Sequence, residues 1–90
     1  DIKGIDDLNN ELIWGFKAKD GIHLMSIEDD VVVLGCGHYA YALNLENGDK
    51  LWDFEGDEGL NAISVKNAVV VLGHKSGHTY GLNLKTGGKI

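Results

Sequence analysis

The sequence predicts an all-β fold of short antiparallel strands, and three observations support that prediction. Apolar and polar residues alternate in 22–28 and 60–66, as in half-buried strands, and no segment keeps the 3.6-residue period of an amphipathic helix. The run VVVLG occurs at 31–35 and 69–73. It is β-branched and too short for a helix, which predicts strands covered on both faces. Thirteen glycines and no proline suit the tight turns between such strands.

The chain also repeats itself. Segment 13–22 (IWGFKAKDGI) recurs at 51–60 (LWDFEGDEGL), and VVVLG recurs at the same shift of 38 residues, while 41–51 (YALNLENGDKL) recurs at 80–90 (YGLNLKTGGKI) with a shift of 39. Each unit therefore holds four short strands, the last two joined by a hairpin turn at Asn47-Gly48. The predicted strands lie at about 22–28, 31–35, 39–45 and 50–55, and then at 60–66, 69–73 and 78–84.

Four short antiparallel strands in a repeat of this length are typical of a β-propeller blade. The predicted organisation is a degenerate third and fourth strand in 1–17, one full blade in 18–55, and a second unit lacking its last strand in 56–90. A propeller closes with about four to eight blades. Two interpretations stay open: a fragment of a longer propeller, which is the favoured one, or a homo-oligomeric ring completed by strand addition.

Each unit also carries a spaced motif that resembles the tryptophan-docking motif of pyrroloquinoline-quinone-type (PQQ-like) propeller repeats. That motif reads Ala, any residue, Asp, any three, Gly, any three, Trp. The residues at its marked positions in the three copies are Ala42, Asn44, Gly48 and Trp52; Gly4, Asp6, Asn10 and Trp14; and Gly81, Asn83 and Gly87. The resemblance implies that each tryptophan stacks on the glycine peptide of an adjacent motif. These residues are therefore expected to be structural.

Charge and composition exclude several classes of partner. The net charge of -6, with no basic run, disfavours nucleic acid and anionic membrane surfaces. No apolar stretch approaches the roughly 20 residues of a membrane span. The single cysteine, Cys36, excludes an internal disulfide and a cysteine-based zinc site. No targeting segment is present, so the sequence predicts no cell compartment, although many PQQ-like proteins are extracytoplasmic.

No catalytic group of residues is expected. His74 and His78 are four apart, but on a hairpin in a solvent-facing turn rather than on one face of a helix, so no metal site is predicted. No Ser or Cys nucleophile is expected beside a base with a third orienting group. PQQ-dependent dehydrogenases, which share the resembled fold, use a vicinal cysteine pair, a tryptophan beneath the quinone and calcium ligands. One cysteine cannot supply that pair, and no cofactor is predicted.

The predicted function is that of a non-catalytic propeller scaffold that binds a protein, peptide or polymer. The alternative is a piece of a PQQ-dependent quinoprotein dehydrogenase, which calcium-dependent PQQ binding would distinguish. Loops between the fourth and first strands, and between the second and third, should share one face of the blades. The candidate binding residues on that face are Lys19, Asp20, His38, Tyr39, Asp57, Glu58, His74 and Lys75.

Overall fold

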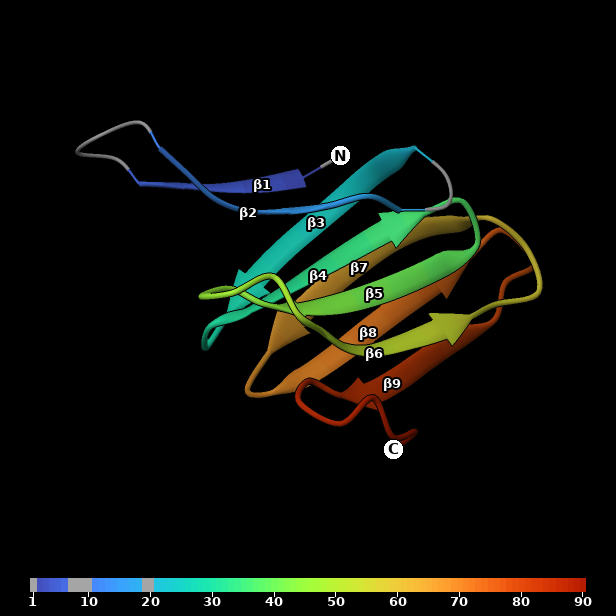
Figure 1. The fold of residues 1–90 in the computed structure, drawn as a ribbon. Helices are drawn as coiled ribbons and strands as arrows, with labels where there is room; N and C mark the ends of the chain where they lie inside the picture. The colour runs from blue at the N-terminus through green and yellow to red at the C-terminus, as the bar shows by residue number, and fades with distance from the viewer. Residues whose placement is uncertain (1, 7–10, 19–20) are drawn as a thin grey trace.

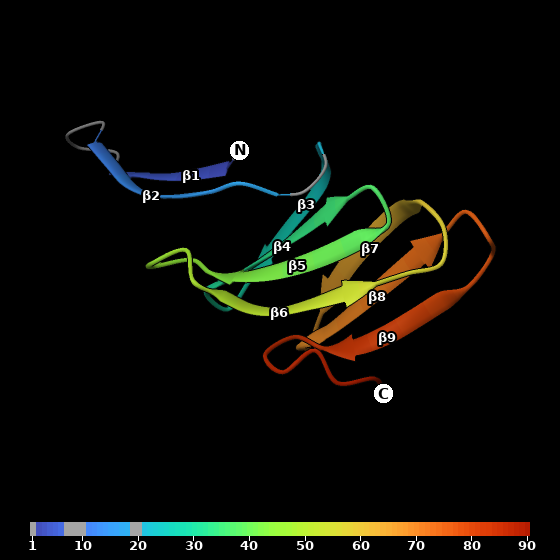
Figure 2. The same cartoon turned by 45° about the vertical axis from the view of Figure 1, so that its right-hand side comes forward.

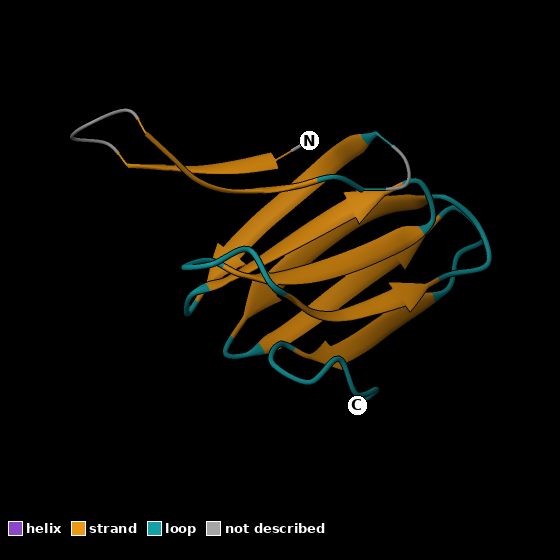
Figure 3. Ribbon diagram, viewed as in Figure 1, coloured by secondary structure: helices purple, strands orange, loops and turns teal. Residues whose placement is uncertain are grey.

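The computed structural model of the chain describes residues 2–6, 11–18 and 21–90, whose regular structure is all β-strand (Figures 1 and 3). Consecutive strands pair antiparallel into a two-stranded, a four-stranded and a three-stranded sheet. The strands of the three sheets are, in order, β1 (Ile2–Asp6) and β2 (Glu11–Phe16); β3 (Ile22–Glu28), β4 (Val31–Cys36), β5 (Tyr39–Asn44) and β6 (Lys50–Glu55); and β7 (Leu60–Lys66), β8 (Val69–His74) and β9 (Thr79–Asn83).

The four-stranded and three-stranded sheets pack face to face. Both views place β3 beside β7, with the remaining strands stacked outward from that edge (Figures 1 and 2). The β4–β5, β6–β7 and β8–β9 connections gather at one end of the sheets, and the β3–β4, β5–β6 and β7–β8 connections at the other. No helix long and apolar enough to cross a membrane occurs in the part of the chain that the structure describes.

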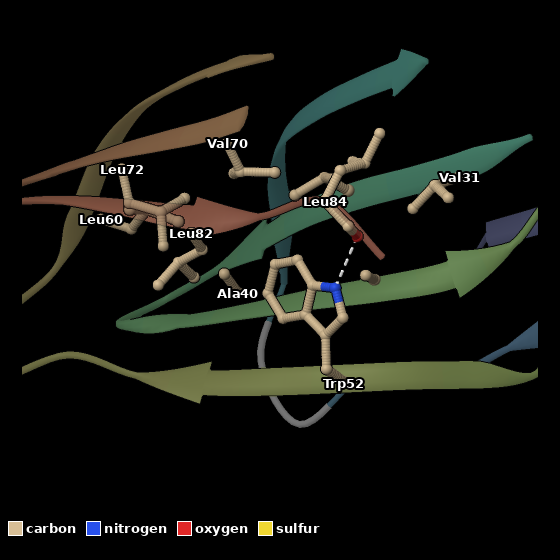
Figure 4. Packing of buried hydrophobic residues seen from close by; sticks show 10 residues of the cluster. Val31, Ala40, Trp52, Leu60, Val70, Leu72, Leu82 and Leu84 are labelled. Carbon is tan, nitrogen blue, oxygen red and sulfur yellow. Dashed lines mark hydrogen bonds between the residues drawn. The ribbon is translucent and has the colours of Figure 1, made fainter. Parts of the chain in front are cut away.

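The core lies between these two sheets, and alternate residues of each strand supply it. Val31 and Val33 of β4 face Val70 and Leu72 of β8, and Trp52 closes the outer side of the cluster (Figure 4). A second cluster on the far face of β4 joins its other residues to Trp14. Because β4 has a layer on each side, all of its residues are buried.

The two copies of VVVLG differ in burial, which corrects one expectation. The sequence predicted that both would be covered on both faces. In β8 only alternate residues are buried, and Val71 is 42% exposed, because no strand of the described chain lies on that side. Burial of a strand face depends on its spatial neighbour, which the local sequence does not encode.

The connection between β5 and β6 is also longer than the predicted Asn47-Gly48 hairpin turn. Residues 45–49 form a loop in which Gly48 N donates to Asn44 O at 2.7 Å and Gly48 takes a φ of 76°. The two-residue turns with positive φ at both positions are instead 29–30 and 67–68, which connect β3 to β4 and β7 to β8. The longer loop carries the backbone on which a tryptophan lies.

Candidate functional site

Each tryptophan is clamped onto the loop of the next sheet. The Nε1 atom of Trp14, on β2, donates to Leu45 O at 2.7 Å. A Cβ built at Gly48 would lie 2.6 Å from Cδ2 of that indole, so the ring rests on bare backbone. The Trp14 side chain is 8% exposed, and burial of so large a ring stabilises by about 2–3 kcal/mol.

Trp52 repeats this arrangement one unit further along the chain. Its Nε1 donates to Leu84 O at 2.7 Å (Figure 4), and a Cβ at Gly87 would lie 2.6 Å from its Cγ. Gly87 has a φ of 75°, like Gly48 in the preceding loop. Two motif residues, Trp52 of one copy and Gly87 of the next, are thus brought together in space although they are far apart in sequence.

The other motif positions shape the same loops. Asn44 Oδ1 accepts from Glu46 N at 2.8 Å, and Asn83 Oδ1 accepts from Lys85 N at 2.9 Å. These side-chain bonds satisfy backbone N–H groups of each loop and help to fix its conformation. The remaining positions are placed by backbone register or lie outside the described residues: Gly4 pairs with Trp14, Ala42 pairs with Trp52, Asp6 pairs with Glu11, Gly81 lies on β9, and Asn10 is not described.

The predicted binding loops do meet at one end of the sheets. Backbone hydrogen bonds tie the 56–59 loop to both neighbouring turns: Gly56 N donates to His38 O at 2.9 Å, and Lys75 N donates to Gly59 O at 2.8 Å. We call residues 37–39, 55–59 and 75–78 the loop face. The candidates Lys19 and Asp20 lie outside the described residues, whereas Glu58 and Lys75 are exposed on this face.

Two histidine–carboxylate pairs order the loop face. His38 Nε2 lies 3.1 Å from Glu55 Oε2, and the His38 ring packs 4.3 Å from that of Tyr39. His78 Nδ1 donates to Asp57 Oδ2 at 2.8 Å. The hydrogen bond from His78 holds the pKa of the Asp57 carboxyl below its ordinary value, and the bond from a serine acts in the same direction.

That serine is Ser76, and its position corrects the expectation that no serine would lie beside a base with an orienting group. Ser76 Oγ donates to Asp57 Oδ1 at 3.1 Å and lies 3.2 Å from His78 Nδ1. In a catalytic triad the nucleophile and the carboxylate contact opposite ring nitrogens. Here both contact Nδ1, so the three side chains do not have the arrangement of a catalytic triad. No local pattern predicts this cluster, because Asp57 lies 19 residues from Ser76 and 21 residues from His78.

His74 was expected in a solvent-facing turn, and this prediction is wrong. The residue ends β8, its side chain points into the core, and it is 4% exposed. Its ring packs beside those of Phe54 and Tyr80, with centroids 6.3 and 5.5 Å away. Among the described residues neither ring nitrogen has a hydrogen-bond partner. His74 is therefore not part of the loop face.

Comparison of the two units explains how the His74 ring fits. A Cβ at Gly56 would overlap the imidazole, so the ring lies directly on that glycine. At a shift of 38, the equivalent residues are Ala18 and Cys36, which pack in the other cluster. The large His74 side chain thus packs on a glycine, whereas the equivalent small side chain, Cys36, is matched by an alanine at position 18.

The described residues contain no group of three His, Cys, Asp or Glu side chains that could hold a metal ion. At the end of the sheets opposite the loop face there is a cavity of about 260 Å³ that the sequence did not predict. It is lined by Asp29, Asp30, Val31, Asn44, Leu51 and Lys85.

No protein-family model matches the chain. A protein of Methanocaldococcus jannaschii described as uncharacterized protein MJECL23 is 46% identical over 50 residues, which cover 53% of this chain and 6% of that protein. The chain therefore corresponds to a small part of the length of this relative.

Solved structures resemble the chain over most of its length. The computationally designed Ika4 protein matches 86% of this chain with a TM-score of 0.80 and 20% identity, and BamB from Moraxella catarrhalis matches 88% with a TM-score of 0.78 and 25% identity. The two larger sheets are β-propeller blades. We call β3–β6 the first blade and β7–β9 the second. The chain spans 50% of the Ika4 chain and 26% of the BamB chain.

Substitution of Gly87 by alanine should destabilise the chain strongly. The new methyl group would meet the Trp52 ring and would force a left-handed φ on a residue with a Cβ. We expect the free energy of unfolding, measured with urea, to fall by about 2–4 kcal/mol. Gly88→Ala is the matched control, because its Cβ would lie 3.4 Å from Thr86 Oγ1, and it should change stability much less. Equal losses of stability in the two variants would contradict the packing of the Trp52 ring on the Gly87 backbone.

Gly56 and His74 should be coupled energetically. Gly56→Ala alone drives a methyl group into the imidazole and should cost about 1–3 kcal/mol. His74→Cys copies the first blade and removes the ring, so Gly56→Ala should cost much less in the double variant. Urea unfolding of the four proteins gives the coupling, expected to be at least about 1 kcal/mol. Additive losses would show that the two residues do not share this space.

Asp57 should titrate below its ordinary value of 3.8 in the folded chain, because His78 and Ser76 donate hydrogen bonds to it. A lowered folded-state pKa means that the contribution of Asp57 to stability is present above pH 4 and is lost as the pH falls through the folded value. Carbon-detected NMR of the carboxyl group should show an upward pKa shift in His78→Ala and a smaller one in Ser76→Ala. A variant at the opposite end, Lys85→Ala, is the control. An unchanged titration in His78→Ala would exclude this hydrogen bond.

Proposed function

We propose that the chain is a non-catalytic β-propeller scaffold unit that binds a protein, peptide or polymer through its loop face. The observation that carries this proposal is the bonding of the 56–59 loop to the turns on both sides, at His38 O and Lys75 N. Loops held in this way present their side chains in a fixed arrangement, which lowers the entropic cost of binding. The His38–Glu55 pair beside the Tyr39 ring suits a polar peptide surface with an aromatic contact.

We further propose that the blades are PQQ-like repeats. The two tryptophan clamps support this assignment, because Trp14 on Gly48 and Trp52 on Gly87 follow the order of the motif copies. In this proposal the unit boundaries at 17/18 and 55/56 separate consecutive blades of a longer propeller or of an assembly.

A piece of a PQQ-dependent quinoprotein dehydrogenase is the alternative. Two observations count against it. The only cysteine, Cys36, is buried in the core, so the chain has no vicinal pair. Both tryptophans contact loops of the neighbouring sheet, so neither presents an open ring face beneath which a quinone could stack. Fluorescence titration with PQQ and calcium tests this alternative, and saturable calcium-dependent binding would favour it.

Selection of peptides from a displayed library against the chain tests the binding proposal. We expect peptides whose affinity falls at least tenfold in Tyr39→Ala and in Asp57→Asn, because both changes alter the ordered loop face. Asp49→Ala and Lys85→Ala, at the opposite end of the sheets, are the matched controls and should leave affinity unchanged. Peptides that lose affinity only in the control variants, or a library that yields no binder, would contradict the proposal.

A further inference from the structure

The outer face of the second blade, which points away from the first, has small residues that nothing in the described chain requires. A Cβ at Gly73 would meet only Asn61 Oδ1 at 3.4 Å and Ala62 Cβ at 3.6 Å, which is ordinary contact. A Cβ at Gly81 would have nothing within 4 Å. Neither glycine has a positive φ. Val71, between them on the same face, is 42% exposed.

The equivalent face of the first blade explains what such small residues accommodate. Gly35 stands where the second blade has Gly73, and a Cβ there would lie 2.8 Å from Leu60 Cδ2 and 3.1 Å from Ile63 Cδ1. Leucine and isoleucine of the adjoining blade therefore lie directly on the Gly35 backbone. By the internal repeat, the face at Gly73 fits a blade that presents aliphatic side chains from its inner strand.

The chain carries such an aliphatic surface at its other side. Met25 and Ile27 of β3 are 56% and 54% exposed. At a shift of 38 they correspond to Ile63 and Val65, which pack on the core between the blades. The exposed Met25 and Ile27 of the first blade are thus an aliphatic surface of the kind that could cover the outer face of the second blade.

We propose that a second copy of this chain docks head to tail on the outer face of the second blade, with its Met25 and Ile27 over Val71 and Gly73. The inference rests on the proposed function as a propeller unit, and it names a partner for that unit. Repetition of the blade-to-blade contact generates this interface, which is heterologous and closes into a ring or continues as an open array.

Polar groups at the edges of the contact agree with this docking. Within the chain, Glu28 Oε2 accepts from Ala68 N at 2.8 Å. The repeat equivalents of these two residues are Lys66 and Asp30. A lysine cannot accept from the Asp30 N–H, so this hydrogen bond is not repeated between copies, and only the opposite charges of the two side chains favour the contact there. Both side chains lie on the exposed surface of the chain by itself.

The second inter-blade bond also has an equivalent. His23 Nε2 donates to Leu60 O at 2.7 Å. The corresponding residues are Asn61 and Ile22, so the amide of Asn61 can donate to the carbonyl of Ile22 in the second copy.

In this assembly β1 must leave its place beside β2. Gly4 of β1 pairs with Trp14, and Ala42 of β5 pairs with Trp52 in the same way. The strand β1 therefore lies beside β2 as β5 lies beside β6. By the repeat, β9 is the equivalent third strand of the second blade. In the joined sheet β9 of one copy therefore replaces β1 of the next. Lys89 and Ile90 already lie along β9 at Leu82 and Gly81 and take the place of residues 12–13 of the next copy, so its β2 pairs with β9 from Trp14 onward. The clamp of Trp14 on its own Gly48 keeps β2 in position, and the indole then lies over Gly81, which explains the small residue there.

Light scattering after gel filtration tests the proposal on the 90-residue chain. We expect a discrete species whose mass is two or more times the 9.8 kDa of one chain. Met25→Lys removes one half of the interface and Gly73→Lys the other, so each variant alone should be monomeric. Mixed in equal amounts, they retain one intact pair of faces and should give a species of twice the monomer mass. Glu58→Lys, at an exposed position of the 56–59 loop outside the proposed contact, is the matched control and should assemble as the wild type does.

A monomeric wild-type chain would overturn the proposal. Assembly that persists in both lysine variants would overturn it as well, because the contact would then lie elsewhere. Far-ultraviolet circular dichroism of each variant confirms that the strands are retained. Neither result contradicts the scaffold function, since the loop face belongs to the single chain and is tested by the peptide selection.

Discussion

The packing of the blades depends on the clamp between an indole and a glycine peptide. Trp52 can bring its Nε1 to 2.7 Å from Leu84 O only because the Gly87 backbone, which carries no Cβ, lets the ring lie flat on the loop. This contact fixes the outer edges of the two blades. At the inner edge, His23 and Glu28 bond to backbone atoms of the second blade. The aliphatic core between the two blades is thus held by contacts at both the outer and the inner edge.

The strands and the fold class could be predicted because they depend on local pattern and period. Alternation along 22–28 and 60–66 identified β3 and β7, and the 38-residue shift separated one blade from the next. Burial could not be predicted in the same way. VVVLG is the same in β4 and β8, yet Val33 is fully buried and Val71 is exposed. The difference in burial comes from the neighbouring sheets, which cover both faces of β4 but only one face of β8, and it cannot be predicted from the residues of the run itself.

The candidate site was predictable as a set of loops but not as a set of contacts. Chain order alone places the β4–β5, β6–β7 and β8–β9 connections at one end of the blades. The pairing of Asp57 with Ser76 and His78 joins two of these loops across about 20 residues of sequence, so spacing rules for helices and strands do not apply. His74 was misplaced for a related reason: its side chain follows the alternation of β8 into the core, whereas its position next to a turn suggested solvent.

Differences between the two repeats separate residues that this chain explains from those that it does not. Gly56 is explained, because its unit carries the His74 ring where the other unit has a small cysteine. Gly73 is different: its equivalent Gly35 is required by Leu60, but nothing in the described chain presses on Gly73 itself. A glycine in a strand weakens that strand by about 0.5–1 kcal/mol relative to alanine. A cost of that size, without any contact that requires it, is the expected sign of a surface shaped for a neighbour outside the chain.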